Sequence, residues 1–116
     1  MNGGIRTMHI HAVVTSLTFN DRAAAEAELS AIVSRVSDMP GFIGGYWVAL
    51  GADHGTSIIV FDSQEAAQTL ANFAENAPYA SVTPRTIQVG EVMAHAGHAL
   101  TEADKANPGQ REGTNR

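Results

Sequence analysis

Apolar and polar positions alternate over residues 7–14, and this period of two predicts the first strand of the chain. Toward its end both faces become apolar, which indicates a strand covered on both sides. A second strand is predicted over residues 42–50 and a third over residues 56–61, with a hairpin loop between them. Gly44 and Gly45 lie inside the second strand and indicate a bulge or a close approach of backbone or ligand.

Helical periods occupy the two intervals between these strands. Asn20 or Asp21 can cap the first helix, and its apolar stripe is formed by Ala25, Leu29, Ile32, Val33 and Val36. Glu26, Glu28 and Arg35 lie off this stripe, and Pro40 and Gly41 end the helix. Asp62 and Glu65 have the spacing of a capping box at the start of the second helix. Its stripe runs through Ala66, Leu70, Phe73, Ala74 and Ala77, and Pro78 stops it.

A fourth strand is predicted over residues 86–96, so the element order is β-α-β-β-α-β. This order predicts one α+β domain over residues 7–96. From residue 97 onward large apolar side chains are almost absent, and residues 97–116 are expected to form a flexible polar tail. One layer of two helices covers only one face of the sheet, although apolar residues point to both. By elimination a second copy of the chain is expected to cover the other face, as a homodimer.

Composition narrows the classes of partner. The net charge of −5, with seven Lys and Arg residues, argues against nucleic acid, because phosphate binding requires a basic surface. The absence of cysteine excludes disulfides and thiolate chemistry. No apolar run approaches the roughly 20 residues of a membrane span, and residues 1–6 do not resemble a signal peptide. We therefore expect a cytoplasmic protein without a membrane partner. Nucleotide-binding glycine motifs and the Gly-x-Ser-x-Gly elbow do not occur.

Two segments carry a resemblance to a known family. They are Met-Pro-Gly-Phe at residues 39–42 and Val-Phe-Asp-Ser-Gln-Glu-Ala-Ala at residues 60–67. With the element order, they resemble the dimeric α/β-barrel superfamily and, within it, the antibiotic-biosynthesis-monooxygenase-like domains. The resemblance implies a ferredoxin-like, four-stranded antiparallel sheet with two helices on one face. It also implies a homodimeric barrel and a pocket between sheet and helices.

The haem-degrading branch of that superfamily is expected to carry Trp near the end of strand three and His late in helix two. Here Phe61 and Ala77-Pro78-Tyr79 occupy those regions. Haem degradation is therefore not expected, and no cofactor or metal is assigned.

Three histidines are the candidate catalytic residues. His9 and His11 lie two residues apart on the first strand and so share a face. In a ferredoxin-like sheet the end of strand four lies beside the start of strand one, which brings His95 near His9. Imidazoles grouped in this way can act as a base toward a substrate phenol, move protons or bind a metal. Solvated histidines at the ends of strands are the competing interpretation.

Five further residues are candidates for substrate binding. Adjacent Tyr46 and Trp47 should point to opposite faces, one toward the helices and one toward the dimer interface. Tyr79 and Arg85 lie in or next to a loop at the end of the sheet, where they can hold a phenolic or anionic group. Glu91 is a candidate base if its strand face is buried, and a solvated charge if that face is exposed.

Two functional hypotheses follow. The first is a cofactor-independent monooxygenase, or a related isomerase or cyclase, that acts on a small aromatic or polyketide-like compound. Such an enzyme need only deprotonate the phenol and exclude water. The second is a non-catalytic homodimer that binds a small ligand or acts in a stress response. The residues leave both open.

Overall fold

The computed structural model describes residues 9–76 and 79–96. The element order β-α-β-β-α-β is confirmed, and the residue bounds are β1 (His11–Phe19), α1 (Arg22–Ser37), β2 (Phe42–Ala49), β3 (His54–Phe61), α2 (Gln64–Glu75) and β4 (Val82–Glu91). The expected tail at residues 97–116 and the stop at Ala77-Pro78 lie outside the described residues. Neither helix in the described part of the chain has the length and apolarity that crossing a membrane requires.

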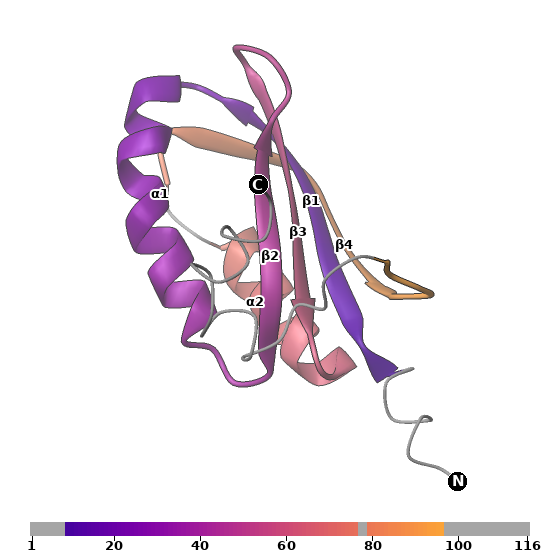
Figure 1. Ribbon diagram of the computed structural model, residues 1–116. Helices are drawn as coiled ribbons and strands as arrows, with labels where there is room; N and C mark the ends of the chain where they lie inside the picture. The colour runs from indigo at the N-terminus through magenta and orange to yellow at the C-terminus, as the bar shows by residue number, and fades with distance from the viewer. Residues whose placement is uncertain (1–8, 77–78, 97–116) are drawn as a thin grey trace, which may run out of the picture.

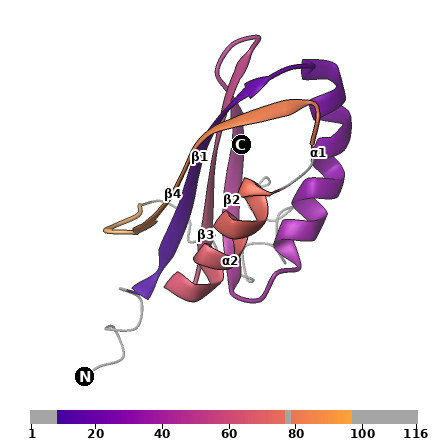
Figure 2. The ribbon, with the colours of Figure 1, turned by 180° about the vertical axis from the view of Figure 1, so that it is seen from behind.

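The four strands form one sheet in the order β2-β3-β1-β4, with every neighbouring pair antiparallel. Figure 1 shows the sheet nearly edge-on with both helices on one side of it, and Figure 2 shows the same layers from behind. Helix α2 packs across β1, β3 and β4, while α1 contacts β2. The expected ferredoxin-like α+β architecture is therefore confirmed.

Helix α1 begins where the sequence predicts. Asp21 has an extended backbone, and its Oδ1 accepts a hydrogen bond from the Ala24 amide at 3.0 Å. This is an N-cap, which satisfies one of the amides that have no partner inside the helix. The helix ends at Ser37, and Gly41, at φ +86°, turns the chain into β2.

The predicted cap of α2 is wrong by one residue. Ser63, not Asp62, has the extended backbone of an N-cap, and its hydroxyl accepts a hydrogen bond from the Ala66 amide at 3.1 Å. The Asp62 amide instead donates to the carbonyl of Gly41 at 2.8 Å, so Asp62, the residue directly after β3, is bound to the turn before β2. The buried residues of α2 are Ala67, Leu70 and Ala71, so of the predicted stripe Leu70 is buried, while Phe73 is 38% exposed.

The neighbouring strands β1 and β4 differ from their predicted bounds toward the same end of the sheet. β1 continues to Phe19 instead of ending at Val14, and β4 begins at Val82 and ends at Glu91 instead of spanning residues 86–96. Phe19 pairs with Val82, so the added parts of the two strands are hydrogen-bonded neighbours.

The predicted bulge in β2 is confirmed. The pairing with β3 shifts register between Phe42 and Gly44. A Cβ on Gly45 would lie 3.2 Å from the carbonyl oxygen of Ile58, so the backbones approach closely here.

The two faces of the sheet differ in what covers them. Val13 and Phe61 are fully buried under the helices, and Phe61 makes an edge-to-face contact with Phe42 at a ring-centroid distance of 6.1 Å. On the opposite face Val14 lies between Ile58 and Gln88, and Ile58 pairs in turn with Tyr46. Val14, Ile58 and Tyr46 are 39%, 41% and 58% exposed, so this row, the outer apolar row, is open.

Candidate functional site

A cavity of about 330 Å³ lies between the sheet and the two helices. Its walls come from β1, β2, β3 and β4, from α1 and α2, and from residues 79–81 before β4. Most of the lining is apolar. The volume is at the lower end of the range of small-molecule pockets, about 300–1,000 Å³, and is adequate for a compact aromatic ligand.

Helix α1 keeps the cavity open because it packs closely only near its ends. Ala25 and Val36 are 9% and 3% exposed. Between them Leu29 and Ile32 are half-buried and line the cavity instead of filling the core. In the central turns of α1, the apolar stripe predicted from the sequence therefore lines the cavity.

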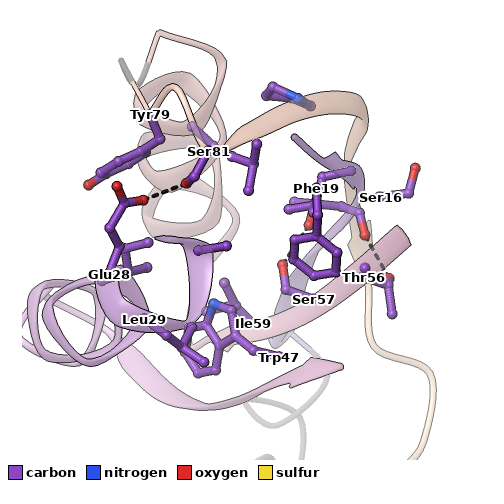
Figure 3. A pocket seen from close by; sticks show the side chains of 18 of the residues that line it. Ser16, Phe19, Glu28, Leu29, Trp47, Thr56, Ser57, Ile59, Tyr79 and Ser81 are labelled. Atoms are coloured by element: carbon purple, nitrogen blue, oxygen red, sulfur yellow. Dashed lines mark hydrogen bonds between the residues drawn. The ribbon is translucent and has the colours of Figure 1, made fainter. Parts of the chain in front are cut away.

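Aromatic side chains form three walls of the cavity. Trp47 comes from β2, Phe19 from the end of β1 and Tyr79 from the loop before β4, and Figure 3 shows them around one space. Gly55 on β3 leaves room for the Phe19 ring, since a Cβ there would lie 2.8 Å from Phe19 Cζ. Flat rings on several sides favour a flat aromatic ligand.

A carboxylate lies on the α1 side of this aromatic space. The Ser81 hydroxyl, on a residue 5% exposed, donates to Glu28 Oε1 at 2.6 Å. Figure 3 shows this bond next to the Tyr79 ring. Its length is typical of an O–H donor on an ionised carboxylate, and such bonds are about twice as strong as neutral ones.

Further polar groups face the same cavity. The hydroxyls of Thr15 and Ser57, a cross-strand pair, are 2.6 Å apart, and either can be the donor. Because one hydroxyl accepts, that hydroxyl keeps a hydrogen that it can donate to a ligand. The half-buried Trp47 indole N–H has no hydrogen-bond partner among residues 9–76 and 79–96. A buried indole N–H usually has one, so this group is available to an acceptor on a ligand.

Arg22 forms part of the rim. Its Nε lies 2.9 Å from Glu26 Oε2, and one terminal nitrogen donates to the Gly51 carbonyl at 3.0 Å. Its guanidinium also lies over the Phe19 ring, 5.2 Å from the centroid. Arg22 therefore joins the start of α1 to the β2–β3 loop, and its charge is paired with that of Glu26.

The three candidate histidines lie away from the cavity. His11 begins β1 and pairs with Glu91 of β4, whereas the cavity is lined by the later part of β1, from Val13 to Phe19. His11 Nδ1 lies 2.7 Å from the carbonyl oxygen of His9 and must donate to it, because a carbonyl only accepts. His95 follows the end of β4 and is exposed. In the described ranges, no three His, Asp or Glu side chains are grouped so that they could hold a metal ion.

The substrate-binding candidates divide into two groups. Trp47 and Tyr79 line the cavity. Tyr46 points to the opposite face, since neighbouring strand residues alternate, and so it belongs to the outer apolar row. Arg85 lines a separate depression of about 310 Å³ beside Glu75, and Glu91 is exposed at the sheet edge. The expectation that Tyr46 and Trp47 face opposite ways therefore agrees with the structure, and the cavity set is corrected to exclude Tyr46, Arg85 and Glu91.

Sequence reasoning missed Glu28 and Ser81 among the cavity residues, as it did Phe19, Thr15 and Ser57. Glu28 lies three residues after Ala25, which places it about 60° around the helix from that stripe residue. It is therefore at the edge of the apolar face and not on the solvent side. A polar residue at this edge is the signal that could have identified it. Ser81 carries no such signal, because its partner is 53 residues away.

Comparisons with known proteins agree with this fold. No protein-family model matches the sequence, and a search among curated proteins gives no match either. Among solved structures, NE2512 from Nitrosomonas europaea, a protein of unknown function, is similar at TM-score 0.63 and 18% identity over 80% of this chain and 98% of that one. SnoaB from Streptomyces nogalater, a cofactor-independent oxygenase, is similar at TM-score 0.58 and 18% identity over 77% and 96%. A proposed antibiotic biosynthesis monooxygenase from Chloroflexus aurantiacus gives TM-score 0.52 and 17% identity over 78% and 98%. The chain thus has the fold of the antibiotic-biosynthesis-monooxygenase-like domains, as the resemblance implied.

Proposed function

We propose that this protein is a cofactor-independent oxygenase that binds a small hydroxylated aromatic or polyketide-like compound in the cavity between sheet and helices. The observation that carries the proposal is the cavity itself, which is apolar, walled by Trp47, Phe19 and Tyr79, and supplied with a few polar groups. The similarity in fold to SnoaB, a cofactor-independent oxygenase, supports the class of reaction.

The energetics of packing support a ligand site over a packing defect. Unfilled space in a protein core costs about 24 cal/mol per Å³. Larger side chains at Ala25 or Ser57 would fill part of this cavity, and both residues are already buried. The small side chains at these two positions leave the space open for a ligand.

The chemistry required of such a protein is limited. A phenol that loses its proton becomes a good electron donor to dioxygen, and an apolar cavity excludes water from the reactive intermediate. For a substrate with an activated CH₂ group beside the phenolic rings, CH₂ and O₂ give C=O and H₂O. One oxygen atom enters the product, the other leaves as water, and the four electrons that reduce O₂ come from the substrate.

Oxygen uptake with a defined probe tests the proposal. The probe 1,8-dihydroxyanthrone carries phenolic hydroxyls and an oxidisable CH₂ group. We expect uptake of one O₂ for each quinone formed, above the rate without protein, with one ¹⁸O atom incorporated from ¹⁸O₂. A panel of simpler phenols and quinols extends the test. Absence of protein-dependent uptake across the panel would contradict the oxygenase proposal.

Ligand binding without turnover is the second candidate. It is favoured by one observation: the three candidate histidines lie outside the cavity, and the lining formed by residues 9–76 and 79–96 contains no imidazole to act as a base. Saturable binding of an aromatic probe with no oxygen uptake would support this candidate.

The proposed assembly is a homodimer formed through the outer apolar row. The face around Val14, Tyr46 and Ile58 is exposed and carries no Asp, Glu, Lys or Arg in that row or in its partner Gln88. An uncharged apolar surface is what allows two chains of net charge −5 to associate without bringing like charges together. A single type of surface that meets its own copy is also the commonest form of dimer.

A further inference from the structure

Glu28 differs from the other carboxylate in the cavity lining. Glu26 is paired with Arg22 at 2.9 Å and is largely exposed. Glu28 is half-buried, and in the described part of the chain no cation pairs with it. It is therefore the unbalanced negative charge of the cavity.

The hydrogen bonds of Glu28 leave one carboxylate oxygen free for a ligand. Ser81 donates to Oε1, and within residues 9–76 and 79–96 no protein group donates to Oε2. An ionised carboxylate has about four acceptor positions, and leaving them empty in a half-buried site is costly unless a ligand or water donates. A hydroxyl on a bound ligand meets this requirement.

We propose that Glu28 is the catalytic base of the site, and that Ser81 is a positioning residue that holds its carboxylate toward the bound phenol. This inference rests on the proposed oxygenase function. In the step, the substrate O–H bond breaks, its electron pair stays on the ring oxygen, and the proton is transferred to Oε2. The phenolate then supplies electrons to dioxygen.

The same charge determines which ligands enter. An anionic ligand would bring a second negative charge next to Glu28, while Arg22, the one Lys or Arg in the described lining, is already paired with Glu26. The cavity should therefore bind a neutral phenol and reject a carboxylate of the same size.

Two matched probes test the charge of the site without any turnover. They are 1-naphthol and 1-naphthoate, which share a ring system and differ in charge. We expect wild-type protein to bind 1-naphthol at least about tenfold more tightly than 1-naphthoate. The Glu28→Gln variant keeps the size of the side chain and removes the charge, so the preference should fall below about threefold. An unchanged preference in that variant would overturn the assignment.

Oxygen uptake with 1,8-dihydroxyanthrone then tests the base. Loss of a general base typically lowers the rate by about 10²–10⁴-fold, so Glu28→Gln should lose at least about 100-fold in kcat and keep its 1-naphthol affinity within about fivefold. Ser81→Ala should lose about 3–30-fold in kcat and keep the preference for 1-naphthol over 1-naphthoate, which general damage to the cavity would not preserve. Glu65→Gln, on the exposed face of α2, is the matched control and should leave kcat unchanged.

The outcomes separate the two proposals. If wild-type protein shows no uptake, the oxygenase function fails and the role of Glu28 as a base fails with it. If wild-type protein is active and Glu28→Gln stays within about threefold of it, the oxygenase function stands and the base assignment is overturned. Glu28→Asp guards against a folding defect in the first variant. It keeps the charge, so it should retain the preference for 1-naphthol and lose activity because its carboxylate is withdrawn.

Discussion

Ser81 is bound to Glu28 by a 2.6 Å hydrogen bond that joins the residue before β4 to the middle of α1. The backbone carbonyl of Ser81 also accepts from the amides of Asn20 and Asp21 at 2.8 and 3.2 Å. One residue thus anchors both the start and the middle of α1. Since α1 packs closely at its ends and spans the cavity between them, these bonds help to hold the helix over the open space.

Replacing Ser81 with alanine should lower stability as well as activity. The hydroxyl is buried, and hydrogen bonds to charged groups contribute about 1.5–3 kcal/mol. Because Glu28 is half-exposed and water can replace part of the bond, we expect a loss of about 1–2 kcal/mol in the free energy of unfolding. Urea unfolding measures it. Ser30→Ala, on the exposed side of α1, is the control and should be neutral or slightly stabilising. Equal effects in the two variants would contradict the importance of the Ser81 bond.

The prediction of the strands shows where a local pattern is sufficient. Residues 11–14 read His-Ala-Val-Val, and this mostly apolar, β-branched end of the alternating segment is predicted as strand from its sequence. Residues 15–19 read Thr-Ser-Leu-Thr-Phe, with only two large apolar side chains, and their strand conformation depends on pairing with residues 54–57 and 82–87. The same pairing extends β4 back to Val82. Long-range partners therefore determine the half of β1 that lines the cavity, and the sequence alone does not show them.

Trp47 and Tyr46 offer a matched pair for testing the cavity. Trp47→Ala removes an aromatic wall and should weaken 1-naphthol binding by about tenfold or more. Trp47→Phe keeps a ring but loses the unpaired indole N–H, so a loss of roughly three- to tenfold is expected if the ligand accepts from it. Tyr46→Ser, one residue away on the opposite face, should leave affinity unchanged. Isothermal titration calorimetry measures all three, and equal losses at positions 46 and 47 would place the binding site elsewhere.

Replacing either of two turn glycines, Gly51 or Gly41, with alanine should lower stability, by different amounts. Gly51 has φ +98°, and a Cβ added there would meet no atom within 4 Å, so Gly51→Ala should cost only the backbone penalty, about 1–2 kcal/mol. Gly41 has φ +86°, and a Cβ there would lie 2.5 Å from Asp62 Oδ1 and 3.1 Å from Ala66 Cβ. Gly41→Ala should therefore cost more, about 2–3 kcal/mol. Thermal unfolding ranks the two, and Gly51→Asn, which tolerates this conformation, should recover part of the loss. A reversed order would contradict the crowding at Gly41.

The sequence predicts that the site is an aromatic pocket between sheet and helices, but it does not identify most of the residues that form it. Trp47 and Tyr79 can be identified because aromatic residues at a sheet face or a sheet end are recognisable without a structure. The histidines are attractive for their chemistry, but His9 precedes β1 and His11 begins it, whereas the cavity is lined by the later part of β1, from Val13 to Phe19. The sequence pattern places Glu28 off the apolar stripe of α1. Whether a residue at the edge of such a stripe faces solvent or a cavity is known only when the surface packed against the helix is known.

Ile58 provides the test of the proposed dimer. It lies in the outer apolar row between Val14 and Tyr46, and in a two-fold assembly through this face each copy would bring its own Ile58 to the interface. Ile58→Glu should convert a dimer to a monomer, because it buries a charge without a partner at the centre of the contact. Gln68→Glu adds the same charge on the exposed side of α2 and should leave the dimer intact. Light scattering coupled to size-exclusion chromatography gives the mass directly. A monomeric wild-type protein would contradict the proposed dimer. A folded Ile58→Glu variant that stays dimeric would show that another surface joins the chains.

The cavity lies on the other side of the sheet, so a folded Ile58→Glu monomer that still binds 1-naphthol would show that each chain carries a complete site.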